Sequence, residues 1–267
     1  MGRIRCNMPS CGCPQGKGRH PVAVVVHGGC WLNQYSLQYM THLSEALTKR
    51  GFATWTLEFR RVGDAGGGWP GTLQDVALGT DFLRQLAKTY PLDLGEVLVI
   101  GHSAGGHLAL WLAARTQLPV SSLLYTPDPL PLKGVVALAG IADLATYSSE
   151  AGSCNAAVEK LMGGLPAAHP ERYAQASPAE LLPVGVPQRL LQGAADPIVP
   201  VRQATAYTAA ATAAGDDARM VLIPEAGHFD LVAPFSPVWS QVEAACLSLL
   251  SGKKQRQLAK KHPATSR

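Results

Sequence analysis

A serine between glycines is the residue whose setting most clearly predicts chemistry in this chain. Ser103 stands in Gly101-His102-Ser103-Ala104-Gly105, between the apolar run 97–100 and a helical pattern that starts at Ala104. A serine on a sharp turn from strand to helix is held in a strained backbone conformation, and glycines two residues away on each side remove side chains that would clash. The pattern predicts a nucleophilic serine whose hydroxyl projects beyond a strand, before the partly positive N-terminus of a helix.

A serine hydroxyl is a weak nucleophile and needs a base that a third group orients. His228 follows the apolar run 220–223, and Asp196 follows the run 190–192, so each lies just past a predicted strand. Parallel strands end at one edge of a sheet, where both side chains can reach Ser103 although they are distant from it in sequence. We therefore predict His228 as the general base and Asp196 as the acid that orients it.

Other residues compete for these roles or support them. His27 and His102 each precede a predicted functional turn and are expected to support the loop backbone. Asp143 follows the apolar run 134–139, so it stays open as an alternative to Asp196 for the acid.

A glycine-rich segment after the first apolar run is a second candidate for catalytic work. His27-Gly28-Gly29-Cys30-Trp31 can present backbone N–H groups to a substrate carbonyl, together with the N–H of Ala104. Such donors stabilise the negative oxygen of a tetrahedral intermediate, often by about 2.7–4 kcal/mol each. A phosphate-binding loop is not expected, because the chain contains no Gly-x-x-x-x-Gly-Lys-Ser/Thr.

Strands and helices that alternate along the chain are expected to position these residues. The predicted strands cover 22–26, 52–59, 97–100, 134–139, 189–192 and 219–223, and the predicted helices cover 37–49, 72–88, 104–115, 201–214 and 237–250. Continuous apolar strands separated by helices predict a mostly parallel central sheet with helices on both faces. The segment 141–186, rich in Ala, Gly, Ser and Pro, interrupts this alternation and is expected to form a small cap over the carboxyl ends of the strands.

The 267 residues are predicted to form one domain over 21–252, between an irregular segment 1–20 and a basic tail 253–267. The net charge of +4 comes from basic residues at these two ends, which contain no acid. A nucleic-acid-binding protein concentrates positive charge on a folded face, so that class is not expected. No apolar stretch is long enough to span a membrane. The basic tail is interpreted as solvated, with docking to an anionic partner as the alternative.

The cysteines predict neither a metal site nor a disulfide framework. Cys6, Cys11 and Cys13 crowd the N-terminus without the second pair that a structural zinc site needs. The N-terminal stretch also lacks the apolar segment of a secretory signal. We therefore expect a cytoplasmic protein with reduced thiols, in which Cys30 is a small residue in the wall of the site.

These motifs together resemble a known group of enzymes. His-Gly-Gly-x-Trp at 27–31, Gly-His-Ser-Ala-Gly-Gly at 101–106, Asp196 and the late His228 resemble the hormone-sensitive-lipase-like esterases and the kynurenine formamidases over residues 21–250. The resemblance implies the α/β-hydrolase fold and a catalytic serine that becomes acylated, with no metal or cofactor.

The same resemblance implies oxyanion donors at the N–H groups of Gly29, Cys30 and Ala104. Cys30 stands where the esterases usually have a third glycine and the formamidases a tyrosine. The function implied is that of a carboxylesterase acting on small-molecule esters with small to medium acyl chains. Hydrolysis of an N-formyl amide stays open as the alternative, as does a non-catalytic binding protein on the same fold. Monomer and homodimer are both compatible with the sequence.

Overall fold

The computed structural model describes residues 11–14, 18–150 and 152–261, and within them the centre of the protein is a seven-stranded sheet. The strands are β1 Cys11–Gly12, β2 His20–Val26, β3 Ala53–Leu57, β4 Leu92–His102, β5 Gly134–Leu138, β6 Gln188–Gly193 and β7 Ala218–Ile223. Their order across the sheet is β1-β3-β2-β4-β5-β6-β7. β1 pairs antiparallel with β3, and the other neighbouring strands are parallel, which confirms the predicted mostly parallel sheet.

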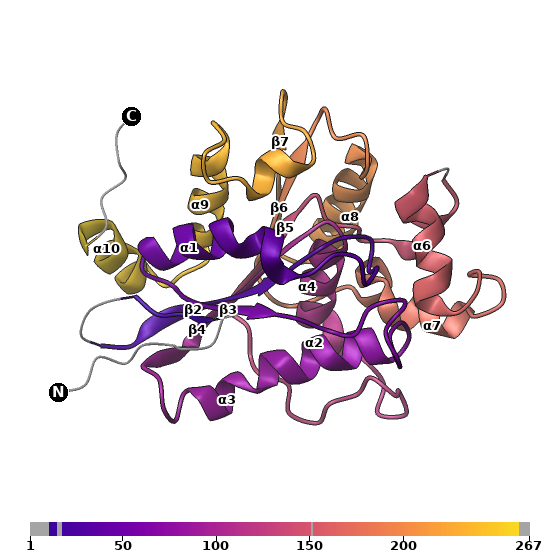
Figure 1. Cartoon of the computed structure of the whole chain (residues 1–267), viewed down its shortest axis with the longest axis horizontal. Helices are drawn as coiled ribbons and strands as arrows, with labels where there is room; N and C mark the ends of the chain where they lie inside the picture. Colours follow the sequence, from indigo (N-terminus) through magenta and orange to yellow (C-terminus); the bar gives the residue numbers. More distant parts are fainter. Residues whose placement is uncertain (1–10, 15–17, 151, 262–267) are drawn as a thin grey trace.

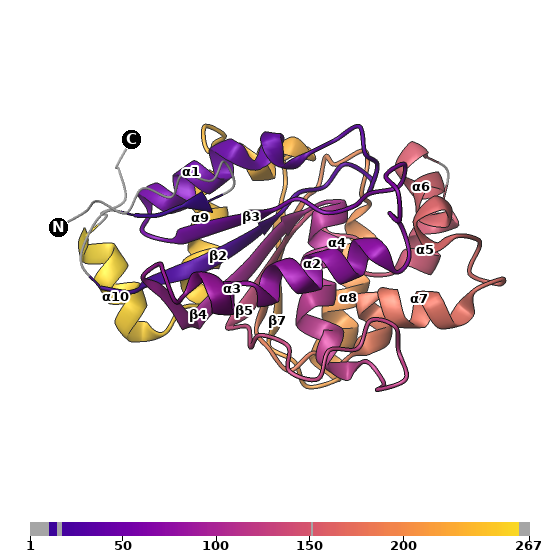
Figure 2. The ribbon, with the colours of Figure 1, turned by 60° about the horizontal axis from the view of Figure 1, so that its bottom comes forward.

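Helices cover both faces of this sheet, as Figures 1 and 2 show. One face carries α1 Thr41–Lys49, α9 Trp239–Ser248 and α10 Gly252–Lys261, and the other carries α2 Gly71–Asp81, α3 Leu83–Leu86, α4 Ala104–Ala114 and α8 Val201–Ala213. β2 serves both cores because successive side chains of a strand point to opposite faces. Val22, Val24 and Val26 belong to one buried cluster, and Ala23 and Val25 belong to the other. Within the described residues, no helix is both long and apolar enough to cross a membrane.

The described residues of the segment 141–186 form helices and no strand. Its elements are α5 Leu144–Ser148, α6 Ser153–Met162, α7 Pro170–Ala176 and the 3₁₀ helix η3 Pro178–Leu181, and in Figure 1 α6 and α7 lie together at one end of the molecule. Three further 3₁₀ helices are η1 Leu37–Met40, η2 Arg115–Gln117 and η4 Phe229–Val232. Val158 and Leu161 of α6 are fully buried in the core shared with α2 and α4. The segment is thus anchored by its apolar side chains.

The segment 1–20 is not irregular throughout, contrary to the prediction. Cys11 and Gly12 pair with Trp55 and Thr54 at the edge of the sheet, and β2 already begins at His20. Two residues held by backbone pairing are too few to produce a periodic pattern, so this strand could not be predicted from hydrophobic periodicity.

The predicted basic tail 253–267 is also wrong in part, because α10 extends to Lys261. Leu258 of this helix is only 4% exposed and joins the core beneath α1 and α9. The Nζ of Lys254 lies 2.9 Å from the carboxylate of Asp93 and donates to the carbonyl of Arg19 at 2.6 Å. The buried Leu258 and the contacts of Lys254 together anchor the helix.

Candidate active site

Ser103 occupies the strained turn that its sequence predicts. Its φ of 56° and ψ of −121° place it between β4 and α4, and its N–H donates to the carbonyl of Leu138 at 2.8 Å. A Cβ on Gly101 would lie 2.0 Å from the carbonyl oxygen of Gly105, and a Cβ on Gly105 would lie 2.2 Å from that of Val26. Both positions therefore require glycine for the turn to close against its neighbours.

His228 and Asp196 meet, as predicted. The Nδ1 of His228 lies 2.7 Å from Oδ2 of Asp196. Their side chains are 4% and 0% exposed, so the pair is shielded from solvent. The two residues come from the loops after β7 and β6, whose last residues Ile223 and Gly193 pair in register. A carboxylate accepts and does not donate, so Nδ1 carries a proton and Nε2 is left to accept one.

The Asp196 carboxylate is held by further hydrogen bonds. Its Oδ1 accepts from the N–H groups of Ile198 at 2.8 Å and Val199 at 3.0 Å, and its Oδ2 accepts from Nε2 of Gln192 at 3.1 Å. Burial raises the pKa of this carboxyl, but the bonds from His228, Val199 and Ile198 outweigh it, so the pKa is lowered overall. Asp196 is therefore charged and fixed in orientation.

These three residues share one cavity. A hollow of about 620 Å³ is lined by Ser103, Asp196 and His228, and also by Gly29 and Cys30. The alternative acid Asp143 does not line it. Asp143 instead begins α5, where its carboxylate accepts from the N–H of Thr146 at 3.1 Å. The geometry therefore favours Asp196 over Asp143 as the partner of His228.

The loop after β2 turns sharply beside this cavity. Gly29, Cys30 and Trp31 all have positive φ, of 95°, 52° and 57°. The Trp31 indole is fully buried and donates to Nδ1 of His107 at 3.2 Å. The N–H groups of Gly29 and Cys30 donate to no acceptor within the described residues. These two unpaired donors thus belong to residues that line the cavity.

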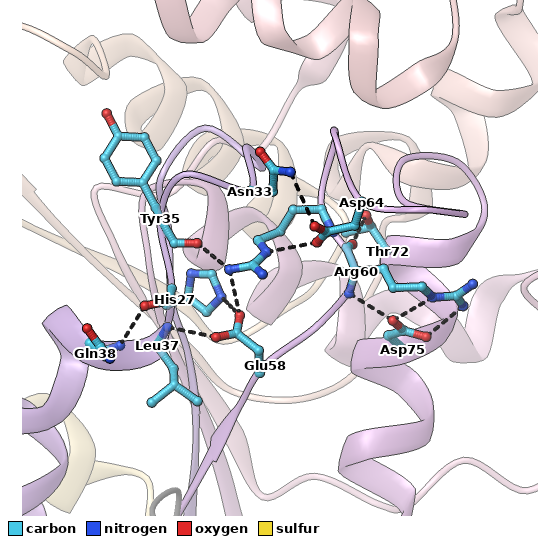
Figure 3. A network of polar contacts seen from close by, with 12 residues as sticks. His27, Asn33, Tyr35, Leu37, Gln38, Glu58, Arg60, Asp64, Thr72 and Asp75 are labelled. Atoms are coloured by element: carbon cyan, nitrogen blue, oxygen red, sulfur yellow. Dashed lines mark hydrogen bonds and ion pairs between the residues drawn. The ribbon is translucent and has the colours of Figure 1, made fainter.

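A polar network beneath this loop ties it to the end of β3 (Figure 3). The carboxylate of Glu58 accepts from Nε2 of His27 at 2.7 Å and from the N–H of Leu37 at 3.2 Å, and it pairs with Arg61 at 3.1 Å. Arg61 also donates to the carbonyl of Tyr35. Burial raises the pKa of Glu58, but the His27 bond and the neighbouring charges outweigh it and lower the pKa overall. His27 contacts the backbone through Nδ1, which lies 2.8 Å from the Gly28 carbonyl, and this confirms its predicted support of the loop.

His102 joins the serine turn to the histidine loop, as expected of a supporting residue. Its Nε2 lies 2.9 Å from the backbone carbonyl of His228, which can only accept, so Nε2 carries the proton. Its Nδ1 then accepts from the hydroxyl of Tyr39, 3.2 Å away. The Tyr39 oxygen in turn accepts from the N–H of Gly28. Burial and then the nearby His228 lower the pKa of His102 to about 3, so it stays neutral and keeps this arrangement.

Tyr39 is a member of the site that sequence reasoning missed. It falls on the apolar face of the predicted helix 37–49, and nothing in its spacing marks it as polar in function. Its place follows from the pairing of β2 with β4, which brings the segment after Val26 beside Gly101 and its neighbour His102. The Tyr39 hydroxyl thereby connects the glycine-rich loop to His102 of the serine turn, and His102 in turn connects both to the histidine loop.

The prediction of reduced thiols is wrong for Cys30 and Cys154, which form a disulfide with their Cα atoms 5.0 Å apart. Cys30 does line the cavity wall as expected, and Cys154 of α6 lines it too. The two residues are 124 positions apart, so only the folded arrangement of the loop after β2 and α6 brings their sulfurs together.

Comparisons with known proteins place the chain in a family and a fold. The BD-FAE family matches residues 12–210. A solved structure named bifunctional GH43-CE from Bacteroides eggerthii aligns with a TM-score of 0.73 at 22% identity, covering 88% of this chain and 35% of that one, so the chain spans about a third of its length. A truncated carbohydrate esterase from gut microbiota aligns with a TM-score of 0.69 at 20% identity, covering 93% of this chain and 86% of that one. Thermogutta terrifontis esterase 2 phosphonylated by sarin aligns with a TM-score of 0.72 at 16% identity, covering 96% of this chain and 91% of that one.

These neighbours share the α/β-hydrolase fold with the chain, which confirms the predicted fold class. No curated protein sequence matches the chain.

Proposed function

We propose that this chain, which belongs to the BD-FAE family, is a serine hydrolase that cleaves carboxylic esters through an acylated Ser103. In this proposal Nε2 of His228 takes the proton of Ser103 as Oγ attacks the ester carbonyl. The protonated imidazole then gives that proton to the departing alcohol. Water attacks the acyl-serine with His228 again as base, which releases the acid and restores Ser103. Asp196 holds the imidazole and stabilises its charged form throughout.

The N–H groups of Gly29, Cys30 and Ala104 are the proposed oxyanion donors. The first two lack an acceptor within the described part of the chain and belong to residues that line the cavity, and Ala104 opens α4 directly after Ser103. Gly28 is excluded from this role because its N–H already donates to Tyr39. Donors fixed in advance need no reorganisation when charge develops on the substrate oxygen, which is the source of their effect.

The observation that carries the proposal is the shielded 2.7 Å contact between His228 and Asp196, on a cavity that Ser103 also lines from a strained turn. A structural turn has no need of a positive φ at a serine, and strain of this kind is concentrated at functional sites. The esterase names of the structural neighbours favour ester hydrolysis among the reactions that this arrangement can perform.

A fluorophosphonate probe tests the nucleophile, and a relative phosphonylated by sarin makes this chemistry a fitting choice. We expect stoichiometric labelling of the wild type, located at Ser103 by peptide mapping, and none of Ser103→Ala. Ser121→Ala changes an exposed serine and serves as the matched control that should label fully. An unlabelled wild type would instead support a non-catalytic binding protein on this fold.

Substrate choice requires a separate panel. p-Nitrophenyl esters of increasing chain length measure the depth of the acyl site, and an acetylated sugar tests the class that the name of one neighbour suggests. We expect the highest kcat/KM among esters with small to medium acyl chains. A kcat/KM for N-formylkynurenine well above that for every ester would replace ester hydrolysis with formamide hydrolysis at the same serine.

A further inference from the structure

The disulfide lies where a redox change would reach the proposed active site. Cys30 belongs to the loop after β2 and Cys154 is the second residue of α6, and both line the cavity that contains Ser103. A hollow of about 620 Å³ gives a small thiol access to both residues. Cys246 of α9 is a useful contrast, because it is 1% exposed and burial raises its pKa to about 12. Reagents that reach the cavity therefore leave Cys246 unmodified.

The loop that holds Cys30 depends on its anchors. Cys30 and Trp31 are both in the left-handed region, which side-chain-bearing residues adopt only when surrounding contacts hold them there. Gly28 is anchored by Tyr39, and Trp31 is anchored by His107 and by the bond from the Val62 N–H to its carbonyl at 2.8 Å. The Cys30 side chain itself is joined to α6 by the disulfide in the wall of the cavity.

The partner helix has other attachments. Val158, Leu161 and Met162 of α6 are fully buried, and the carbonyl of Leu161 accepts from the Trp69 N–H at 2.7 Å. Asn155, next to Cys154, donates to the carbonyl of Tyr147 at 2.7 Å. Reduction would therefore leave α6 in place and would remove the link that holds the Cys30 side chain between the anchored Gly28 and Trp31. The N–H groups of Gly29 and Cys30, which lie between those anchors, would then be free to move.

We propose that Cys30 and Cys154 form a reversible redox site in the wall of the catalytic cavity, whose disulfide holds the loop 28–31 in its active conformation. A thiolate of a small dithiol attacks one sulfur of the pair, and its second thiolate then closes to a cyclic disulfide. The pair gains two electrons and two protons and becomes two thiols, while the dithiol is oxidised. A low-molecular-weight disulfide reverses the reaction. The effect on turnover rests on the proposed function, whereas the pairing and the effect on the loop do not.

The first test compares oxidised and reduced wild-type protein. Alkylation and peptide mapping without reductant should find a cross-linked Cys30–Cys154 peptide pair, and treatment with dithiothreitol should convert it to two modified thiols while Cys246 stays unmodified. We expect kcat to fall about tenfold or more on reduction, with a smaller change in KM. Displaced oxyanion donors stabilise the transition state less, whereas the binding of the substrate depends less on them. Glutathione disulfide should restore kcat. A retained cooperative melt shows that the reduced protein is folded.

A variant separates this site from the other cysteines. Cys154→Ser keeps the Cys30 N–H and every other thiol, so its kcat should equal that of reduced wild type and should not respond to dithiothreitol. Cys246→Ala is the matched control and should respond as wild type does. Hydrogen exchange of a peptide covering 27–32 adds a readout that needs no activity, and we expect faster exchange after reduction and in Cys154→Ser.

Three results overturn the inference. The first is that the cross-link does not form in the presence of oxidant. The second is that it forms but hydrogen exchange of the peptide 27–32 is equally fast in the oxidised and reduced protein. The third is that reduction of the cross-link leaves kcat unchanged. Loss of esterase activity and of fluorophosphonate labelling in both redox forms would contradict the proposed function instead. In that case the cross-link and the exchange rate still decide whether the pair controls the loop.

Discussion

Tyr39→Phe is the sharpest test of how the three loops are joined. The substitution removes one oxygen atom, which accepts from the N–H of Gly28 and donates to Nδ1 of His102. Burial raises the pKa of this hydroxyl, so the wild type keeps its proton across the working range. Both Gly28 and His102 are buried, and each would be left without its partner.

The magnitude follows from these two lost partners. A buried polar group left unsatisfied costs about 1–3 kcal/mol, so two such groups set a range of about 2–6 kcal/mol. Tyr39 lines the cavity, where water can replace its hydroxyl, so we expect the lower end of that range. About 2 kcal/mol lowers the melting temperature of a protein of this size by about 4–8 °C. Loss of this hydrogen-bonded link should also reduce kcat by about tenfold to 10²-fold, because small displacements of the reacting groups lower the rate strongly.

Tyr35→Phe is the matched control for this experiment. Tyr35 also lines the cavity, its ring points away from the polar network (Figure 3), and its hydroxyl makes no hydrogen bond to the described residues. We expect its melting temperature and kcat to stay close to wild type. Thermal melts and ester kinetics of the three proteins measure both effects. Equal melting temperatures and equal kcat for the two variants would refute the assignment of Tyr39 as the residue that joins the loops.

Three further predictions follow from the same geometry. Asp196→Asn should lower kcat by about 10³- to 10⁴-fold, because the imidazole of His228 loses the carboxylate that fixes its tautomer, while a cooperative thermal melt shows that the variant is folded. A loss of kcat below tenfold in steady-state kinetics would argue against the pairing of Asp196 with His228. Gly101→Ala should destabilise the fold by more than about 3 kcal/mol in urea titrations, because its Cβ would lie 2.0 Å from a carbonyl oxygen, whereas Gly95→Ala in the same strand meets nothing closer than 3.6 Å and should be tolerated. Asp196 and Glu58 have lower pKa values in the folded than in the unfolded protein, so each adds stability above its unfolded-state pKa, near pH 4, and this stability is lost as the pH falls through the folded-state pKa. The free energy of unfolding in urea should therefore fall between pH 7 and pH 3, and a free energy that does not change with pH would contradict the prediction.

The elements of the proposed active site were predictable because much of their signal is local. The turn at Ser103 needs Gly101 because a Cβ there would meet the carbonyl of Gly105, four residues along the chain, whereas Gly105 is required by the carbonyl of Val26 on the neighbouring strand. The strand–helix alternation is equally local, although β4 extends to Leu92, beyond the predicted apolar run 97–100. Its first half carries polar and partly exposed residues such as Asp93, which hide the strand from a hydrophobicity pattern.

What the sequence by itself determined was therefore the parallel sheet, the strained serine and the order in which acid and base follow it, because periodicity and backbone sterics act between near neighbours. Only the tertiary structure decided that Asp196 rather than Asp143 meets His228, that Tyr39 bridges two loops, and that Cys30 pairs with Cys154. Each of these contacts joins residues brought together by the order of strands in the sheet or by the packing of α6. Local sequence patterns do not indicate which distant residues become neighbours, because those contacts depend on the packing of the whole core.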